Sequence, residues 1–164
     1  PGRGAWASAS REAIVKAVRG GLLNRTLKTN ARLPEGRSAE DVADDIARGL
    51  RERCLDAAGL ARRAGAARLG FDMAFEALGK KKAAVLLIAA DASDDGAAKL
   101  IRVAGGAAVV RLFTTDEQAR AFGREKVVYA VIESGPPAER FLREAARLEG
   151  METSAGAPAL ESAL

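Results

Sequence analysis

The 164-residue chain has no histidine, one cysteine and few aromatic side chains, and it lacks any long apolar run. With Cys54 alone and no histidine, it offers no His-based triad, no Cys–His dyad and no Cys/His zinc site. No apolar segment approaches the roughly 18 residues that span a bilayer. A single cysteine forms no internal disulfide, which fits a reducing compartment. We therefore expect a cytoplasmic protein that is not an enzyme, uses no cofactor and binds no membrane.

Apolar residues make up 48% of the chain but aromatic residues only 4%, so its core must consist mainly of aliphatic side chains. From residue 38 to 150, helical patterns alternate with extended ones, which predicts an α/β/α layered domain with a largely buried sheet. The expected strands are 66–69, 83–89, 108–113 and 127–133. The expected helices begin near 38, 73, 94, 116 and 136, and the last ends at Gly150.

Local signals place several helix ends. Ser38 to Asp41 and Thr114 to Glu117 have capping-box spacing, and Asp72 is a candidate N-cap for the helix near 73. Apolar residues recur every four positions in the first long helix and predict one buried stripe (Val42, Ile46, Leu50, Cys54 and Ala58).

The positive charge is concentrated in the first quarter of the chain. Residues 1–37 carry eight Lys/Arg and two acidic residues, a net charge of +6, whereas the remainder carries 18 basic and 20 acidic residues, a net charge of −2. This distribution is typical of a segment that binds a polyanion, although a solvated basic arm would look the same. Within it, Ser8 or Ser10 is the expected cap of a helix that ends at Gly20-Gly21. Residues 22–28 are a candidate for a further basic helical turn, and 29–37 reads as a linker. Residues 151–164 are expected to form a disordered tail.

A glycine-punctuated loop with arginines precedes the second helix of the 38–150 region. Gly65 and Gly70 would let the backbone approach a phosphate or base, and Arg62, Arg63 and Arg68 would add phosphate contacts. An ordinary helix–strand–helix connection with solvated arginines remains an equal alternative on spacing alone.

Three carboxylates follow the strand 83–89. Asp91, Asp94 and Asp95 could bind magnesium at the carboxyl end of that strand. Helix capping by short polar residues explains the same pattern without a metal, and we favour it.

Residues 50–150 resemble the kink-turn-binding family of archaeal ribosomal protein seven-Ae, and within it the short bacterial YlxQ-like proteins. The resemblance rests on the run Leu60 to Gly65, on Gly70, on the strand from Val85 followed by Asp91, and on Phe122-Gly123. It implies an α/β/α sandwich over a mixed, roughly four-stranded sheet and an RNA-binding loop.

The loop itself departs from the family pattern, which reads Gly-Thr-Asn-Glu with a lysine three positions later. Gly70 matches, but Phe71, Asp72 and Met73 replace the next three residues and Glu76 replaces the lysine. Asp72 lacks the amide donors that read sheared G·A pairs, and Met73 offers no useful hydrogen bond.

The first 28 residues resemble the C-terminal half of the YlxR-like RNA-binding family. The Gly-Arg-Gly-Ala-aromatic motif reads Gly2, Arg3, Gly4, Ala5 and Trp6, and a basic stretch ending in Arg25 to Lys28 follows a helix. Trp6 could stack on an RNA base or anchor the segment to the core. The resemblance implies an incomplete small α+β domain with its opening half upstream of Pro1, fused to a YlxQ-like domain.

Together these features predict an RNA-binding protein linked to translation, the ribosome or RNA processing. RNA is the expected partner, with ribosomal or RNase P proteins as further partners. The alternative is a degenerate RNA-binding fold that serves as a protein-interaction module in a ribonucleoprotein. The candidate RNA-binding residues are Gly2, Arg3, Gly4, Trp6, Arg25, Lys28, Arg62, Arg63, Gly65, Arg68, Gly70, Phe71, Asp72, Arg124 and Lys126.

Overall fold

The computed structural model describes residues 7–30, 32–152 and 160–162. Its helices are α1 (Arg11–Arg19), α2 (Leu22–Leu27), α3 (Ala39–Arg63), α4 (Phe71–Gly79), α5 (Asp94–Val103), α6 (Thr115–Ala121) and α7 (Pro136–Glu152). Its strands are β1 (Ala67–Leu69), β2 (Ala83–Ile88), β3 (Ala108–Val110), β4 (Tyr129–Glu133) and β5 (Leu160–Ser162). Helices and strands alternate from α3 to α7 as the sequence predicts.

The sheet is mixed, with strand order β1-β4-β2-β3-β5. Strand β4 runs antiparallel to both its neighbours, β1 and β2, whereas β2 and β3 are parallel. As a consequence, the carboxyl ends of β1, β2 and β3 and the start of β4 lie at the same end of the sheet. This end is called the loop end below.

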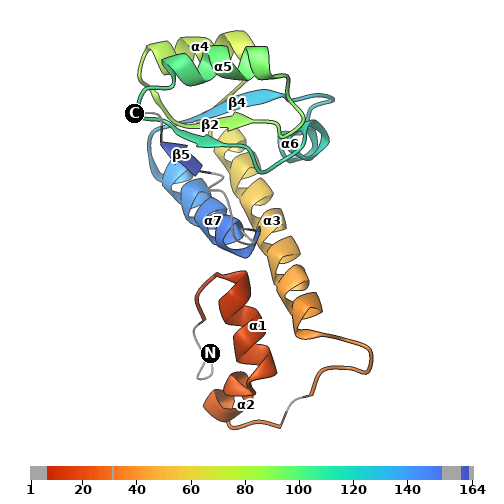
Figure 1. Cartoon of the computed structure of the whole chain (residues 1–164). Helices are drawn as coiled ribbons and strands as arrows, with labels where there is room; N and C mark the ends of the chain where they lie inside the picture. The colour runs from red at the N-terminus through yellow and green to blue at the C-terminus, as the bar shows by residue number, and fades with distance from the viewer. Residues whose placement is uncertain (1–6, 31, 153–159, 163–164) are drawn as a thin grey trace.

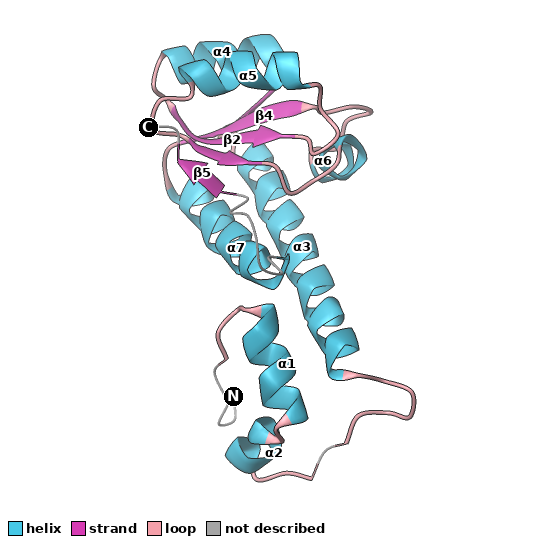
Figure 2. Cartoon of the chain, in the orientation of Figure 1, coloured by secondary structure: helices cyan, strands magenta, loops and turns pink. Residues whose placement is uncertain are grey.

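Helices cover both faces of the sheet, α4 and α5 on one and α3 and α7 on the other (Figures 1 and 2). In β2, Val85 and Leu87 pack on the side of α3 and α7, while Leu86 and Ile88 pack on the side of α4 and α5. A continuously apolar strand is what burial on both faces requires. The predicted three-layer α/β/α sandwich is confirmed.

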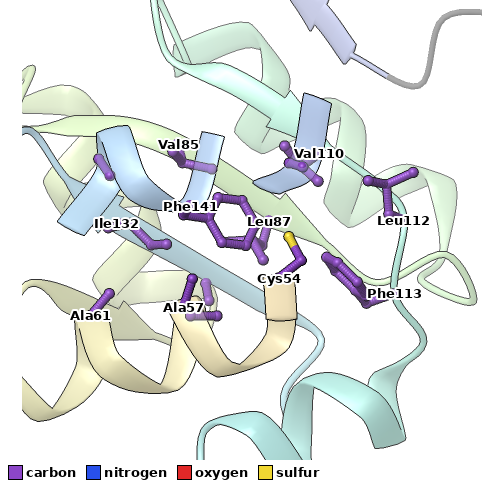
Figure 3. Close-up of a cluster of buried hydrophobic side chains, with 14 of the residues drawn as sticks. Cys54, Ala57, Ala61, Val85, Leu87, Val110, Leu112, Phe113, Ile132 and Phe141 are labelled. Carbon is purple, nitrogen blue, oxygen red and sulfur yellow. The ribbon is translucent and has the colours of Figure 1, made fainter. Parts of the chain in front are cut away.

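The larger of the two apolar clusters lies between the sheet and the pair α3 and α7, where Cys54 is close to Phe113 and Phe141 (Figure 3). The two phenylalanine rings meet edge to face with centroids 6.5 Å apart. Burial raises the pKa of the Cys54 thiol to about 12, so this side chain packs as a small apolar group.

Helix α3 is 25 residues long, about 37 Å, and its N-terminal half extends beyond the sheet (Figure 1). Its predicted capping box is present, because the Ser38 hydroxyl accepts from the Asp41 N–H and the Asp41 carboxylate accepts from the Ser38 N–H. The predicted apolar stripe is only partly right: Cys54 and Ala58 are buried, but Ile46 is 36% exposed. Positions four apart advance about 400° around a helix, so a strict four-residue stripe drifts off the buried face.

Helix α1 packs against the projecting half of α3, where Ala17 and Ala43 are buried, and α2 packs against α1. Helix α1 begins after Ser10, one of the two predicted caps, and α2 ends one residue before the end of the predicted 22–28. The predicted linker 29–37 lies between α2 and α3.

The C-terminal segment departs from the prediction. Helix α7 continues through Gly150 to Glu152, because the buried Met151 anchors its last turn. Residues 160–162 form β5, which pairs with β3 and covers the sheet edge that β3 would otherwise expose, so the expected disordered tail is wrong for these residues.

None of the helices within the described ranges is long and apolar enough to cross a membrane.

Substitution of two glycines of α3 by alanine should change the stability of the fold in opposite directions. A Cβ at Gly59 would lie 2.8 Å from the Ala121 carbonyl oxygen, whereas a Cβ at Gly49 meets nothing within 4 Å. We expect Gly49→Ala to stabilise the fold by about 0.5–1 kcal/mol through helix propensity. Gly59→Ala should destabilise it by about 1–3 kcal/mol through overpacking.

Urea denaturation followed by circular dichroism measures both changes. A Gly59→Ala variant as stable as Gly49→Ala would contradict the close contact between α3 and α6.

Candidate nucleic-acid interface

The predicted glycine loop is not one loop but two turns separated by β1. Gly65 (φ 73°) ends α3, and Gly70 (φ 93°) precedes α4. Gly65 lies at the far end of β1, where the Glu133 N–H donates to the Ala66 carbonyl. Gly70 lies at the loop end, where its N–H donates to the Tyr129 carbonyl at 2.8 Å. Of the two predicted glycines, only Gly70 belongs to the loop end.

Helix α4 begins two residues earlier than predicted. Gly70, not Asp72, is its N-cap, and the Gly70 carbonyl accepts from the Ala74 N–H. Glycine suits this position because the backbone has a positive φ just before the helix. Asp72 lies exposed in the first turn, where the positive end of the helix dipole stabilises its negative charge.

Three aromatic rings meet beside Gly70. Phe71 stacks on Phe75 with centroids 6.1 Å apart and planes 19° apart, and it meets Tyr129 edge to face at 5.8 Å. The Tyr129 hydroxyl reaches α5 where Gly96 leaves room, since a Cβ there would lie 2.2 Å from that oxygen. The sequence reasoning included Phe71 and missed its partners, although the spacing of Phe71 and Phe75 places both on one helix face.

Residues 122–128 connect α6 to β4 at the loop end. Arg62 of α3 donates to the Gly123 carbonyl at 3.4 Å, which ties the end of α3 to this connection. Arg124 and Lys126 are exposed on it, and neither forms an ion pair with any described residue. The hydrogen bond from Gly70 to Tyr129 brings this connection beside the start of α4.

Arg63 and Arg120 line a groove between α3 and α6. Both are exposed and without an ion pair among the described residues, so they add two available cations next to Arg62 and Gly123. Sequence reasoning missed Arg120, because only the close approach of Gly59 to Ala121 places it beside α3.

Arg68 lies elsewhere. It projects from β1 toward α4 and forms an ion pair with Glu133 at 3.0 Å, so its charge is already balanced within the fold. The neighbouring Glu76 pairs with Lys80, and this contact lowers the pKa of Glu76.

The basic N-terminal segment is partly neutralised by α3. Arg11 pairs with Asp44 at 2.5 Å and Arg19 with Glu40 at 2.5 Å. Arg37 pairs with Asp45 and lowers the pKa of that carboxyl.

Other cations of this segment are exposed. Arg25 donates to the Gly20 carbonyl at 3.0 Å, and Lys28 caps α2 with φ 51°. The candidates Gly2, Arg3, Gly4 and Trp6 lie outside the described residues.

The helix-capping interpretation that the sequence favoured for the carboxylates after β2 is not what the structure shows, because Ser93 is the N-cap of α5 and its side chain makes no capping hydrogen bond. Asp91 and Asp95 have other partners. Asp91 accepts from the N–H and hydroxyl of Thr115 at 2.8 and 2.9 Å, which lowers the pKa of Asp91 and fastens the start of α6 to the end of β2. Asp95 pairs with Lys99. Within the described residues, no group of three or more Cys, Asp or Glu side chains is arranged to hold a metal ion.

Comparison with known proteins identifies the fold and nothing finer. No protein-family model matches the sequence, and no curated protein does. A solved protein of unknown function from Bacillus halodurans C matches with a TM-score of 0.54 and 19% identity. The match covers 57% of this chain and 97% of that one, and it supports the α/β sandwich fold.

Because the pKa of Asp91 is lowered in the folded state, we expect the stability of the protein to fall in acid. The folded-state pKa of this carboxyl lies below the unfolded value of about 3.9, so its stabilising effect is present above about pH 4 and is lost as the pH falls through the folded value. We expect Asp91→Asn to lower the urea midpoint at neutral pH and to match the wild type in strong acid.

Asp94→Asn is the matched control, since Asp94 is 99% exposed and its nearest cation, Arg111, is 3.8 Å away. An Asp91→Asn midpoint equal to that of this control at neutral pH would show that the tie to Thr115 contributes nothing.

Proposed function

We propose that this chain is an RNA-binding protein of the cytoplasm, linked to translation, the ribosome or RNA processing. The observation that carries the proposal is the group of cations at and beside the loop end. Arg63, Arg120, Arg124 and Lys126 come from three separate parts of the chain, and no described carboxylate pairs with any of them. Exposed cations that folding leaves unpaired are available to phosphates.

The surrounding backbone supports the same function. Gly70 lets α4 begin beside Tyr129, the residue at which the connection 122–128 leads into β4. A helix N-terminus adds hydrogen-bond donors and a favourable dipole for anions. The likeness of the sequence to YlxQ-like proteins points to RNA as the anion.

The N-terminal segment would supply a second contact. Arg25 and Lys28 are exposed in and directly after α2, a helix that lies far from the sheet (Figure 1). The resemblance to YlxR-like proteins adds Arg3 and Trp6. Residues 1–37 and 38–150 would then act as two RNA-binding modules of one fusion protein.

A protein-interaction module is the second candidate, and an apolar groove favours it. The groove lies between α1, α2 and the start of α3, and it is lined by Val18, Leu23, Leu27, Leu33 and Val42. Leu27 and Leu33 are 46% and 41% exposed. Crosslinking that recovers ribosomal or RNase P proteins and no RNA would favour this function over the first.

Neutralising the cations of the loop end should weaken RNA binding. For Arg124→Gln and for Lys126→Gln, we expect lower affinity for single-stranded RNA and a salt dependence shallower by about 0.7 log units per log unit of salt for each lost phosphate contact. Fluorescence anisotropy across a salt series measures both quantities.

Arg140→Gln is the control, because Arg140 is an exposed cation near the start of α7, at the opposite end of β4. Equal losses in all three variants would mean that binding follows net charge alone, and salt-insensitive binding or none at all would refute the proposed function.

The N-terminal contact has its own test. We expect the double variant Arg25→Gln/Lys28→Gln to weaken RNA binding, because both cations are exposed and neither forms an ion pair within the described ranges. Arg19→Gln should have a smaller effect, since Glu40 already pairs with Arg19. Electrophoretic mobility shift measures both affinities. A larger loss for Arg19→Gln than for the double variant would contradict an RNA contact through Arg25 and Lys28.

A further inference from the structure

The aromatic side chains at the loop end form a ladder that is anchored at one end and open at the other. Tyr129 lies at the start of β4 with its hydroxyl against α5, and the rings of Phe71 and Tyr129 meet edge to face. Phe75 stacks on Phe71 and is 46% exposed. The inner rings therefore hold Phe75 in place, while nearly half of its surface faces solvent.

Burial in the core does not explain Phe75. The apolar cluster beneath α4 and α5 is built from Ala74, Ala77 and Leu78 with residues of β2 and α5, and Phe71 and Tyr129 pack against its margin. Phe75 belongs to neither group. Met73 is equally exposed at 46%, but it lies about 200° around the helix from Phe75, in the hollow that Arg68 and Lys80 line.

The inner end of the ladder borders a polar hollow. Tyr129 lines it with two hydroxyl side chains, one cation and three carboxylates (Ser93, Thr115, Lys126, Asp91, Asp116 and Glu125). Three carboxylates against one cation do not favour a phosphate, so binding of a nucleotide here would depend on the rings themselves. An exposed π face that further rings hold in place is what proteins use to stack an unpaired base.

The same end of the fold offers little for reading paired bases. Asp72 is an acceptor without donors and Met73 is apolar, so the first turn of α4 lacks the amide that would read a sheared base pair. Stacking needs no such group, because every base has a π face.

We propose that Phe75, supported by Phe71 and Tyr129, is a stacking platform for an unpaired RNA base, so that the chain selects single-stranded or bulged RNA over a continuous duplex. This inference rests on the proposed RNA-binding function and names the class of RNA that this site takes.

The test compares the affinity of the full chain for a short unstructured RNA with that for a blunt duplex of the same length and at the same salt. Phe75→Ala should weaken single-strand binding about five- to hundredfold, the usual effect of losing one base–aromatic stack. Phe75→Leu, which keeps an apolar side chain but no π face, should also bind more weakly. Neither change should alter duplex binding or the salt dependence.

Met73→Ala is the matched control, since it removes an equally exposed apolar side chain from the same helix. We expect it to bind both RNAs as the wild type does. If Met73→Ala lowered the affinity for single-stranded RNA as much as Phe75→Ala does, the stacking proposal would be wrong, because the effect would then not be specific to Phe75.

The outcomes separate the two proposals. If the wild type binds single-stranded RNA with a clear salt dependence and Phe75→Ala binds equally well, the platform is wrong and the RNA-binding function stands. Equal weakening of duplex and single-strand binding by Phe75→Ala would also overturn the platform. If the wild type binds neither RNA, both proposals fail.

Discussion

The rest of the structure depends on the close packing of small side chains along the second half of α3. Ala57, Ala58 and Ala61 are buried against the sheet, and Gly59 leaves room for the Ala121 carbonyl at a distance that no Cβ would tolerate. This packing fixes α3 beneath the sheet and brings α6 against it, which places the end of α3 beside the connection that leads into β4. The other half of the same helix remains outside the sandwich, where its carboxylates hold α1 and the linker. One helix thus positions both basic parts of the molecule.

Folding redistributes the charge that the sequence carries. The first 37 residues contain the whole positive excess, yet three of their arginines are paired with carboxylates at the start of α3. The 38–150 region has no positive excess, yet it gathers several unpaired cations beside one group of loops. Net charge by segment is therefore a poor guide to where a polyanion binds, because ion pairs between segments remove cations from use and tertiary packing concentrates others. For the proposed function, the loop end gains importance relative to the N-terminal segment.

Much of the fold could be predicted from the sequence, because strand β2 and the capping boxes at Ser38 and Thr114 are local signals. The predicted ends of α4 and α7 were wrong, because contacts between residues far apart in the sequence determine where these helices begin or end. Gly70 caps α4 because its backbone pairs with Tyr129, and α7 passes Gly150 because Met151 is buried. The candidate site was predictable only in part. Glycine spacing singled out Gly70 and the family resemblance added Phe71, but neither could show that Arg68 pairs with Glu133. Whether a cation is available depends on partners far away in the chain, and no local pattern contains that information.

The most direct test of the account maps where RNA touches the full chain. Single-stranded RNA carrying a photoreactive uridine is crosslinked to the protein, and the modified tryptic peptides are identified by mass spectrometry. The account predicts adducts in peptide 69–80, which contains Phe71 and Phe75, and in peptide 127–140, which contains Tyr129. Adducts confined to residues 1–37 would contradict the assignment of RNA to the loop end, and a protein that forms no adduct with any RNA would contradict RNA binding itself.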